Sequence, residues 1–324
     1  MLKVNEISRV YGETTVVDKL SFTVNEGEFV ALLGPSGCGK STSLKMIAGL
    51  ETPDHGSIEL DGKDITHLTP GERKLAMVFQ SYALFPHLKV RENILFGLKA
   101  RKVPKAEQKR RLDSVVELVG LEAQLDKKPG QLSGGQCQRV ALARAVVAEA
   151  KLCLMDEPLS NLDAKLRNEM RTEIRALQQR LGMSVIYVTH DQVEAMSMAD
   201  RIVLMNDGKI EQIDVPEVLY SKPKTVFTAQ FIGNPPMNII NSEDGNLGVR
   251  PEHIMISDDG MPARVISCDY HGADTIVLAN ANADPAIQGG GEKLIKIRYP
   301  GHALFAENQQ ISISWTPENE HRFP

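Results

Sequence analysis

The octamer GPSGCGKS, residues 34 to 41, constrains the fold more than any other stretch of this chain. It stands between the apolar run FVALL and a helical pattern, and it matches the G-x-x-x-x-G-K-[ST] pattern of a phosphate-binding loop. The glycines let the backbone wrap a β-phosphate, Lys40 reaches the β and γ oxygens, and the Ser41 hydroxyl binds Mg²⁺. The expected phosphate-binding residues are Gly34, Pro35, Ser36, Gly37, Cys38, Gly39, Lys40, Ser41 and Thr42.

Three further apolar runs end in polar residues. LAMVF leads into Gln80, LCLM into Asp156 and Glu157, and SVIYVT into His190. Apolar runs without alternation are typical of strands buried on both faces of a parallel sheet, whose carboxyl ends gather ligands at one edge. Asp156 is placed to hold Mg²⁺, and Glu157 is the natural general base for an attacking water. The shared position of Gln80 and His190 favours a γ-phosphate contact.

A second candidate phosphate site lies at LSGGQ, residues 132 to 136. The free N–H groups and the positive dipole at the start of a helix suit a phosphate. The alanine-rich run that follows LSGGQ predicts such a helix. The residues expected to meet the phosphate are Ser133, Gly134, Gly135 and Gln136.

The pattern of apolar and polar residues changes after residue 235. Short alternating runs such as ARVISCDY, DTIVLAN and EKLIKIRY are separated by Gly, Asn, Asp and Pro, a pattern that predicts an all-β domain, a small barrel. We interpret ANANADPAIQGGG as a loop. The chain of 324 residues therefore divides into domains at 1–235 and 236–324.

Composition excludes several classes of function. The net charge of −5 gives no basic face for nucleic acid, so no nucleic-acid partner is expected. No apolar run approaches the roughly 18 to 20 residues that span a bilayer, and the opening residues lack the apolar core of a signal peptide. We therefore expect a cytosolic protein. Its four cysteines lack metal-ligand spacing and fit reduced thiols.

Six spaced motifs together resemble the ATP-binding cassette (ABC) ATPases: GPSGCGKST, Gln80, LSGGQ, LCLMDE, SNLD at 160–163, and His190. The resemblance covers the first 235 residues and implies an α/β P-loop NTPase fold, a RecA-like core with a helical subdomain at about 86–150. It makes Tyr11 the aromatic that stacks on adenine, Gln80 the magnesium and water sensor, and His190 the γ-phosphate switch. It also places Asp163 among the nucleotide-binding residues.

In that family two chains pair head to tail, so each ATP lies between the phosphate loop of one copy and the LSGGQ of the other. The two phosphate sites of one chain therefore serve different ATP molecules. ATP closes the homodimer, and hydrolysis lets it open.

Other stretches resemble the carbohydrate importers of this family: SYALFPHLKVRENILFGL, HDQVEAMSMADRI, GNPPMN and VRPEHI. That resemblance implies an oligonucleotide-binding-like (OB-like) barrel at 236–324. It also implies two transmembrane permease subunits, an extracytoplasmic solute-binding protein, and a location at the cytoplasmic face of the plasma membrane. The segment from Tyr82 to Leu88 is rich in apolar and aromatic residues, and we expect it to dock against the permease.

Two alternatives stay open. The cargo could be a metal oxyanion, iron or a polyamine, because ATPases for those cargos carry related barrels. A soluble ABC ATPase of DNA repair or translation is the second alternative, although such chains usually have coiled-coil insertions or two cassettes. A regulatory module without catalysis is disfavoured, because Lys40, Asp156 and Glu157 are all present.

Overall fold

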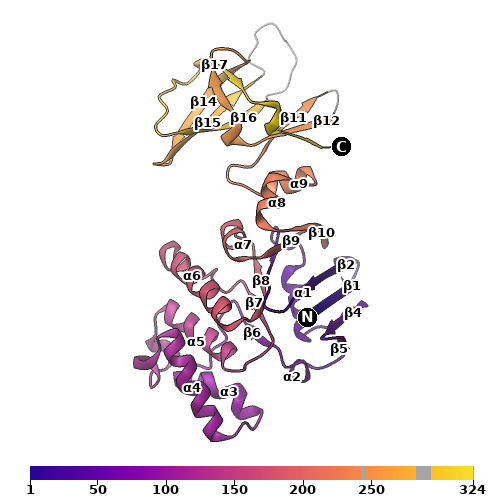
Figure 1. Cartoon of the computed structure of the whole chain (residues 1–324), viewed down its shortest axis with the longest axis vertical. Coiled ribbons are helices and arrows are strands. Elements are labelled where there is room, and N and C mark those ends of the chain that lie inside the picture. Colours follow the sequence, from indigo (N-terminus) through magenta and orange to yellow (C-terminus); the bar gives the residue numbers. More distant parts are fainter. Residues whose placement is uncertain (243–244, 282–292, 324) are drawn as a thin grey trace. The chain divides into compact units, whose positions relative to one another are not determined.

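The chain folds into two compact units, Met1–Pro216 and Glu217–Pro324 (Figure 1). This computed structural model describes residues 1–242, 245–281 and 293–323. The predicted loop ANANADPAIQGGG falls largely outside the described residues.

A six-stranded sheet forms the centre of the first unit, in the order β10-β9-β3-β8-β7-β6. Its strands are β3 (Phe29–Leu33), β6 (Ala76–Val78), β7 (Leu152–Asp156), β8 (Ser184–Thr189), β9 (Arg201–Asn206) and β10 (Lys209–Asp214). All pairings are parallel except the β9–β10 hairpin. Every residue of β3 and β8 is buried, as the unbroken apolar runs predict. The predicted α/β core is confirmed.

A four-stranded antiparallel sheet, in the order β2-β1-β4-β5, accompanies this core. It comprises β1 (Leu2–Tyr11), β2 (Thr14–Val24), β4 (His55–Leu60) and β5 (Lys63–Asp64). Helices α1 (Lys40–Ala48) and α2 (Pro70–Arg73) belong to the same part of the chain. Leu2, Ile7 and Leu20 of this sheet share one buried apolar cluster with Leu44 and Ile47 of α1. The antiparallel sheet therefore packs on the helix that follows the phosphate loop.

Helices α3 (Val90–Ala100), α4 (Lys105–Val119) and α5 (Gly134–Val146) lie within the range 86–150 that the sequence analysis assigns to a helical subdomain. They have an apolar core of their own, in which Ile94, Val116 and Val140 are buried. Helices α6 (Ala164–Leu181) and α7 (Gln192–Met198) flank β8 in sequence.

The second unit carries two short helices and two antiparallel sheets. The helices are α8 (Pro216–Ser221) and α9 (Val226–Phe231). One sheet has the order β11-β12-β18, with strands Asn238–Ser242, Gly245–Val249 and Glu320–Phe323. The other has the order β13-β17-β14-β15-β16, with strands Met255–Ser257, Gln310–Ser314, Met261–Tyr270, Asp274–Asn280 and Leu294–Pro300. The β character expected after residue 235 is present.

Arg250 explains why the second unit begins before residue 236. Its guanidinium donates to the backbone carbonyls of Tyr220, Ala229 and Ile232 and lies 4.0 Å from the centre of the Tyr220 ring. These contacts attach α8 and α9 to the β domain. The predicted boundary at 235/236 therefore falls inside the second unit.

Candidate active site

The phosphate loop joins β3 to α1, and close backbone packing requires two of its glycines, Gly34 and Gly39. A Cβ atom at Gly34 would lie 2.2 Å from the carbonyl oxygen of Met205, and one at Gly39 would lie 2.5 Å from that of Val16. Gly39 also has a φ of 94°, in the left-handed region that side chains disfavour. No side chain fits at either position without moving the backbone.

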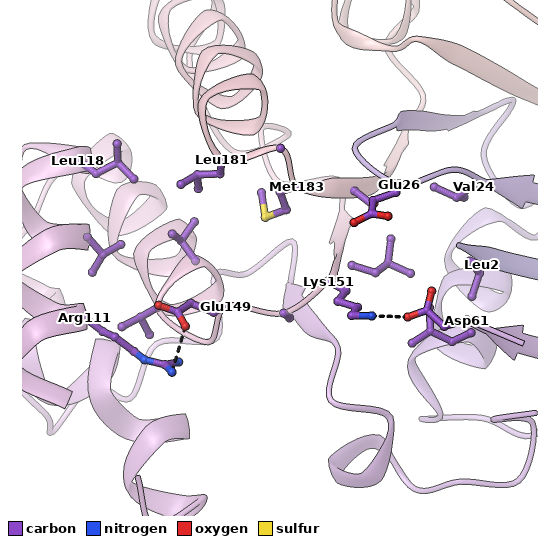
Figure 2. A pocket seen from close by; sticks show the side chains of 18 of the residues that line it. Leu2, Val24, Glu26, Asp61, Arg111, Leu118, Glu149, Lys151, Leu181 and Met183 are labelled. Atoms are coloured by element: carbon purple, nitrogen blue, oxygen red, sulfur yellow. Dashed lines mark hydrogen bonds and ion pairs between the residues drawn. The ribbon is translucent and has the colours of Figure 1, made fainter. Parts of the chain in front are cut away.

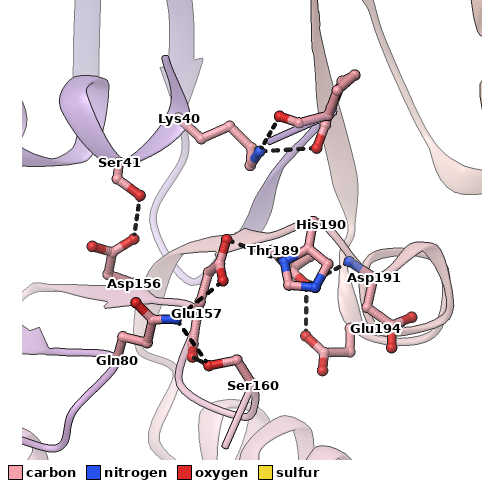
Figure 3. A network of polar contacts seen from close by, with 12 residues as sticks. Lys40, Ser41, Gln80, Asp156, Glu157, Ser160, Thr189, His190, Asp191 and Glu194 are labelled. Atoms are coloured by element: carbon pink, nitrogen blue, oxygen red, sulfur yellow. Dashed lines mark hydrogen bonds and ion pairs between the residues drawn. The ribbon is translucent and has the colours of Figure 1, made fainter. Parts of the chain in front are cut away.

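Lys40 points back into this loop (Figure 3). Its Nζ donates to the carbonyl oxygens of Gly34 at 2.8 Å and Pro35 at 2.7 Å, and the residue is only 5% exposed. The buried ammonium is therefore held within the loop, where phosphate oxygens can replace the two carbonyls as its partners.

Ser41 and Asp156 meet beside the loop. The Ser41 hydroxyl donates to Asp156 Oδ1 at 2.8 Å, joining the start of α1 to the end of β7. Burial raises the pKa of Asp156, and the nearby Glu157 carboxylate adds to that rise, whereas the Ser41 hydrogen bond lowers it. A hydroxyl and a carboxylate are the hard oxygen donors that Mg²⁺ prefers. The residues present therefore fit that ion.

Glu157 lies between two other predicted site residues, Gln80 and His190. Its backbone has a left-handed φ of 42°, an unfavourable conformation of the kind that clusters at active sites. Its N–H donates to the Val188 carbonyl at 3.0 Å, which ties it to β8. Its carboxylate lies 3.2 Å from Nδ1 of His190 and 3.5 Å from Nε2 of Gln80 (Figure 3). The structure thus brings together three residues that the sequence analysis selected.

Two residues of the SNLD motif hold Gln80 in place, a role that the sequence analysis missed. The Gln80 side chain donates to Ser160 Oγ at 3.3 Å, and Asn161 Nδ2 donates to the Gln80 carbonyl at 2.9 Å. Ser160 in turn donates to the Glu157 carbonyl at 2.9 Å. The only sequence signal for this role was that the SNLD motif follows Glu157 by a few residues, which places it near the predicted catalytic base.

The LSGGQ residues stand at the start of α5, as predicted. Ser133 is the N-cap, and its Oγ accepts from the Gln136 N–H at 3.3 Å. Ser133 and Gly134 are exposed, whereas Gly135 is buried with Leu166 3.0 Å from where its Cβ would lie. Among the described residues, no hydrogen bond joins these four positions to the phosphate loop of the same chain.

Tyr11 and Asp163 have local partners in this structure. Tyr11 is 43% exposed, its hydroxyl donates to Glu51, and the Arg9 guanidinium lies 4.9 Å from its ring centre. Asp163 caps α6 by accepting from the Leu166 N–H at 3.0 Å. The exposure of Tyr11 is compatible with stacking on a base, and both assignments stay predictions.

A pocket of about 330 Å³ lies at the amino ends of the parallel strands β7 and β8, opposite the carboxyl ends that carry the predicted site (Figure 2). Its lining includes Leu152 and Ser184, the first residues of β7 and β8, whereas Asp156 and Glu157 lie at or beyond the carboxyl end of β7. None of the predicted nucleotide-binding or catalytic residues lines it. We therefore do not assign this pocket to the nucleotide.

Cys38 offers a chemical test of the loop. Its side chain is 4% exposed with its sulfur 3.7 Å from Lys40 Nζ, and burial raises its pKa. We expect maleimide labelling to be slow at neutral pH and to accelerate as the pH rises, because only the thiolate reacts. Labelling should block nucleotide binding, and Mg-ATP should protect the thiol. Peptide mass spectrometry also reads Cys153, which is fully buried and should stay unlabelled throughout. Equal rates at Cys38 with and without Mg-ATP contradict the placement of the loop.

Two family models match the chain. Residues 17–160 match the model described as ABC transporter, and residues 247–323 match the model described as TOBE domain. Within the described part of the chain, no helix is long and apolar enough to cross a membrane.

Similar proteins match over most of the chain. It is 44% identical to the sn-glycerol-3-phosphate import ATP-binding protein UgpC of Ruegeria sp. (strain TM1040), over 99% of this chain and 96% of that protein. It is 49% identical to the spermidine/putrescine import ATP-binding protein PotA of Bacillus anthracis, over 84% of this chain and 81% of that one. A dimeric post-hydrolysis structure of the ATP-binding cassette MJ0796 with ADP and Pi matches with a TM-score of 0.59 at 31% identity, covering 67% of this chain and 99% of that one.

Proposed function

Because this chain belongs to the ATP-hydrolysing import subunits of the ABC transporter family, we propose that it powers the uptake of a sugar or a sugar-like solute. The match to a glycerol-phosphate importer subunit extends over 99% of the chain, C-terminal domain included. The polyamine importer subunits match over a shorter range, 84% of the chain, and support polyamine uptake as the second candidate.

One observation carries the proposed chemistry: the Ser41–Asp156 and Glu157–His190 contacts, at 2.8 and 3.2 Å, stand together beside the phosphate loop. Lys40 and the loop amides hold the phosphates of ATP, and Ser41 and Asp156 hold Mg²⁺, with Gln80 beside them. When bound, the ion neutralises charge on the phosphate oxygens.

In this mechanism Glu157 accepts a proton from a water molecule as that water attacks the γ-phosphate. The bond from the β–γ bridging oxygen to the γ-phosphorus breaks, and ADP and phosphate form. His190 contacts the γ-phosphate and keeps the Glu157 carboxylate oriented toward it. The 3.2 Å distance between His190 Nδ1 and the Glu157 carboxylate supports this role. Gln80 orients the water and the ion, and its attachment to Ser160 supports that role.

The active form that we propose is a head-to-tail homodimer. Ser133 and Gly134 are exposed at the start of α5 and are available to a phosphate held by a second copy. The similar MJ0796 cassette is a dimer with ADP and Pi, which supports a homodimer. ATP then joins two copies, and its hydrolysis releases them.

The remaining partners in this proposal are two permease subunits and an extracytoplasmic solute-binding protein. The chain works at the cytoplasmic face of the plasma membrane. The docking surface is formed by the segment Tyr82–Leu88 together with Phe96, which is 44% exposed; within the segment, Tyr82 and Leu84 also pack against a buried core of the first unit. The rings of Phe85 and Phe96 lie 4.2 Å apart, so the segment presents a packed aromatic surface to the permease.

Reconstitution with the permease pair and binding protein tests the cargo. We expect sn-glycerol-3-phosphate or a related sugar to stimulate ATP hydrolysis and to enter proteoliposomes, with spermidine inactive. Stimulation by spermidine or putrescine alone contradicts the sugar assignment and supports the second candidate. ATP hydrolysis that no permease modulates contradicts the transport function itself.

A further inference from the structure

One buried carboxylate braces the loop that carries His190. This residue stands just after β8, which ends at Thr189, and just before α7, which begins at Gln192. Glu194, in the first turn of α7, is 3% exposed. Its Oε2 accepts hydrogen bonds from the Tyr187 hydroxyl at 2.9 Å and from the Thr189 hydroxyl at 2.7 Å. The end of the strand is thereby joined to the start of the helix.

The Thr189 hydroxyl extends this connection across His190. It accepts a hydrogen bond from the Asp191 N–H at 2.9 Å while it donates to Glu194 (Figure 3). Two hydrogen bonds in series therefore connect the Asp191 N–H, just after His190, to the Glu194 carboxylate. The Thr189 hydroxyl, just before His190, takes part in both of them. Water does not compete for these bonds, because both Thr189 and Glu194 are buried.

Asp191 fixes the chain after His190. Its Oδ1 accepts from the N–H groups of Val193 at 2.8 Å and Glu194 at 3.3 Å, and its Oδ2 lies 3.5 Å from Nη1 of Arg167 on α6. By contrast, the His190 side chain is 52% exposed, and its ion-pair contact is with Glu157. The imidazole is therefore oriented mainly by the backbone from which it projects.

We propose that Glu194 is a positioning residue that aims His190 at Glu157 and the γ-phosphate by fixing the loop between β8 and α7. This inference rests on the proposed function, in which His190 contacts the reacting phosphate. Without the carboxylate, Tyr187 and Thr189 lose their acceptor, and the end of β8 loses its side-chain link to α7, while the Asp191 cap of α7 remains. The phosphate loop lies outside this network, so ATP binding should persist.

Glu194→Leu and Glu194→Gln separate this role from packing. The leucine variant removes the acceptor, and we expect kcat for ATP to fall at least about 10-fold with KM changed less than about 2-fold, as for an interaction made in the transition state. The glutamine variant keeps an acceptor oxygen and should recover kcat to within about 3-fold of the parent chain. Thr189→Val removes the hydroxyl that bonds to Glu194 and Asp191 with little change in shape. It should lower kcat as much as Glu194→Leu does. Wild-type kcat in both Glu194→Leu and Thr189→Val overturns the proposal.

A control variant tests for general destabilisation. Glu28 is also buried, at 9% exposed, accepts from the Asn25 N–H and pairs with Arg201 at 3.2 Å, next to the amino end of β3. Glu28→Leu should lower the melting temperature and leave kcat unchanged. An equal loss of kcat in Glu28→Leu would mean that lost stability, and not His190, explains the Glu194 result.

A double-mutant cycle decides whether the effect passes through His190. We expect Glu194→Leu to cause no further loss of kcat when His190 is already alanine, because the residue to be positioned is gone. Losses that multiply overturn the positioning role. If His190→Ala alone retains full turnover, the proposed role of His190 fails, a result distinct from independent losses in the cycle.

Discussion

Glu157→Gln is expected to stop ATP turnover while leaving ATP bound. Loss of a general base typically costs 10²- to 10⁴-fold in rate, and we expect about that loss in kcat. The amide has the shape of the carboxylate, so it can keep the contacts to His190 and Gln80, but it cannot take a proton from water. Binding should persist because Lys40 and the loop amides, not Glu157, hold the phosphates. Steady-state phosphate release and binding of a fluorescent ATP analogue measure the two effects.

Glu169→Gln is the matched control, because Glu169 is exposed on α6 and has no place in the proposed chemistry. Its turnover should equal that of the parent chain. Turnover of Glu157→Gln within about 3-fold of the parent would remove Glu157 from the role of base.

Phe85→Asp is expected to abolish solute uptake without unfolding the chain. Phe85 is only partly buried, and its backbone is held independently of its ring: Asn93 Oδ1 accepts from the Phe85 N–H at 2.8 Å, and Asn93 Nδ2 donates to the Phe85 carbonyl at 3.1 Å. The segment should therefore keep its shape. At the permease interface, however, an unpaired buried carboxylate costs on the order of several kcal/mol. Co-purification with the permease pair and uptake in proteoliposomes measure the loss.

Tyr270→Asp provides the comparison, because Tyr270 is an aromatic of the second unit that is 56% exposed. It should assemble and transport normally. Circular dichroism of each free variant checks the fold. Full assembly and uptake with Phe85→Asp would place the docking surface elsewhere, and an unfolded free variant would assign Phe85 to the core.

The parallel strands could be predicted because two independent features mark each of them. One is an unbroken apolar run, and the other is a polar residue or a glycine directly after it. The run before Glu157 is apolar because β7 is buried on both faces, and the polar residues after it lie at the ligand edge. The run DTIVLAN likewise predicted β15, in which every second residue, Thr275, Val277 and Ala279, is buried.

The antiparallel sheet at the N-terminus could not be predicted in the same way. β1 pairs with β2 and β4, but its pairing is interrupted by register shifts, and Glu6 has a left-handed φ of 45°. Such irregularities break the period-2 alternation by which a strand is recognised. Its pairing with β4 also joins segments about fifty residues apart, which no local pattern reports.

The roles of Ser160 and Glu194 were hidden for another reason. Each acts through contacts with residues distant in sequence or buried in the fold: Ser160 with Gln80, and Glu194 with Tyr187 and Thr189. A serine after a strand or a glutamate in the first turn of a helix has an ordinary explanation as a local capping or dipole interaction. Only the folded chain shows what these side chains contact.

In the proposed mechanism, ATP joins two copies of this chain through the phosphate loop of one and the LSGGQ of the other. The most direct test of this dimer measures self-association of the Glu157→Gln chain by analytical ultracentrifugation, with and without Mg-ATP, alongside the same chain carrying Ser133→Arg. We predict that Mg-ATP tightens association at least about 10-fold, a gain of about 1.4 kcal/mol. The added arginine should remove that gain while each copy still binds ATP. Association that is equally tight with and without Mg-ATP, or a gain that survives Ser133→Arg, would contradict the proposed ATP-bound dimer.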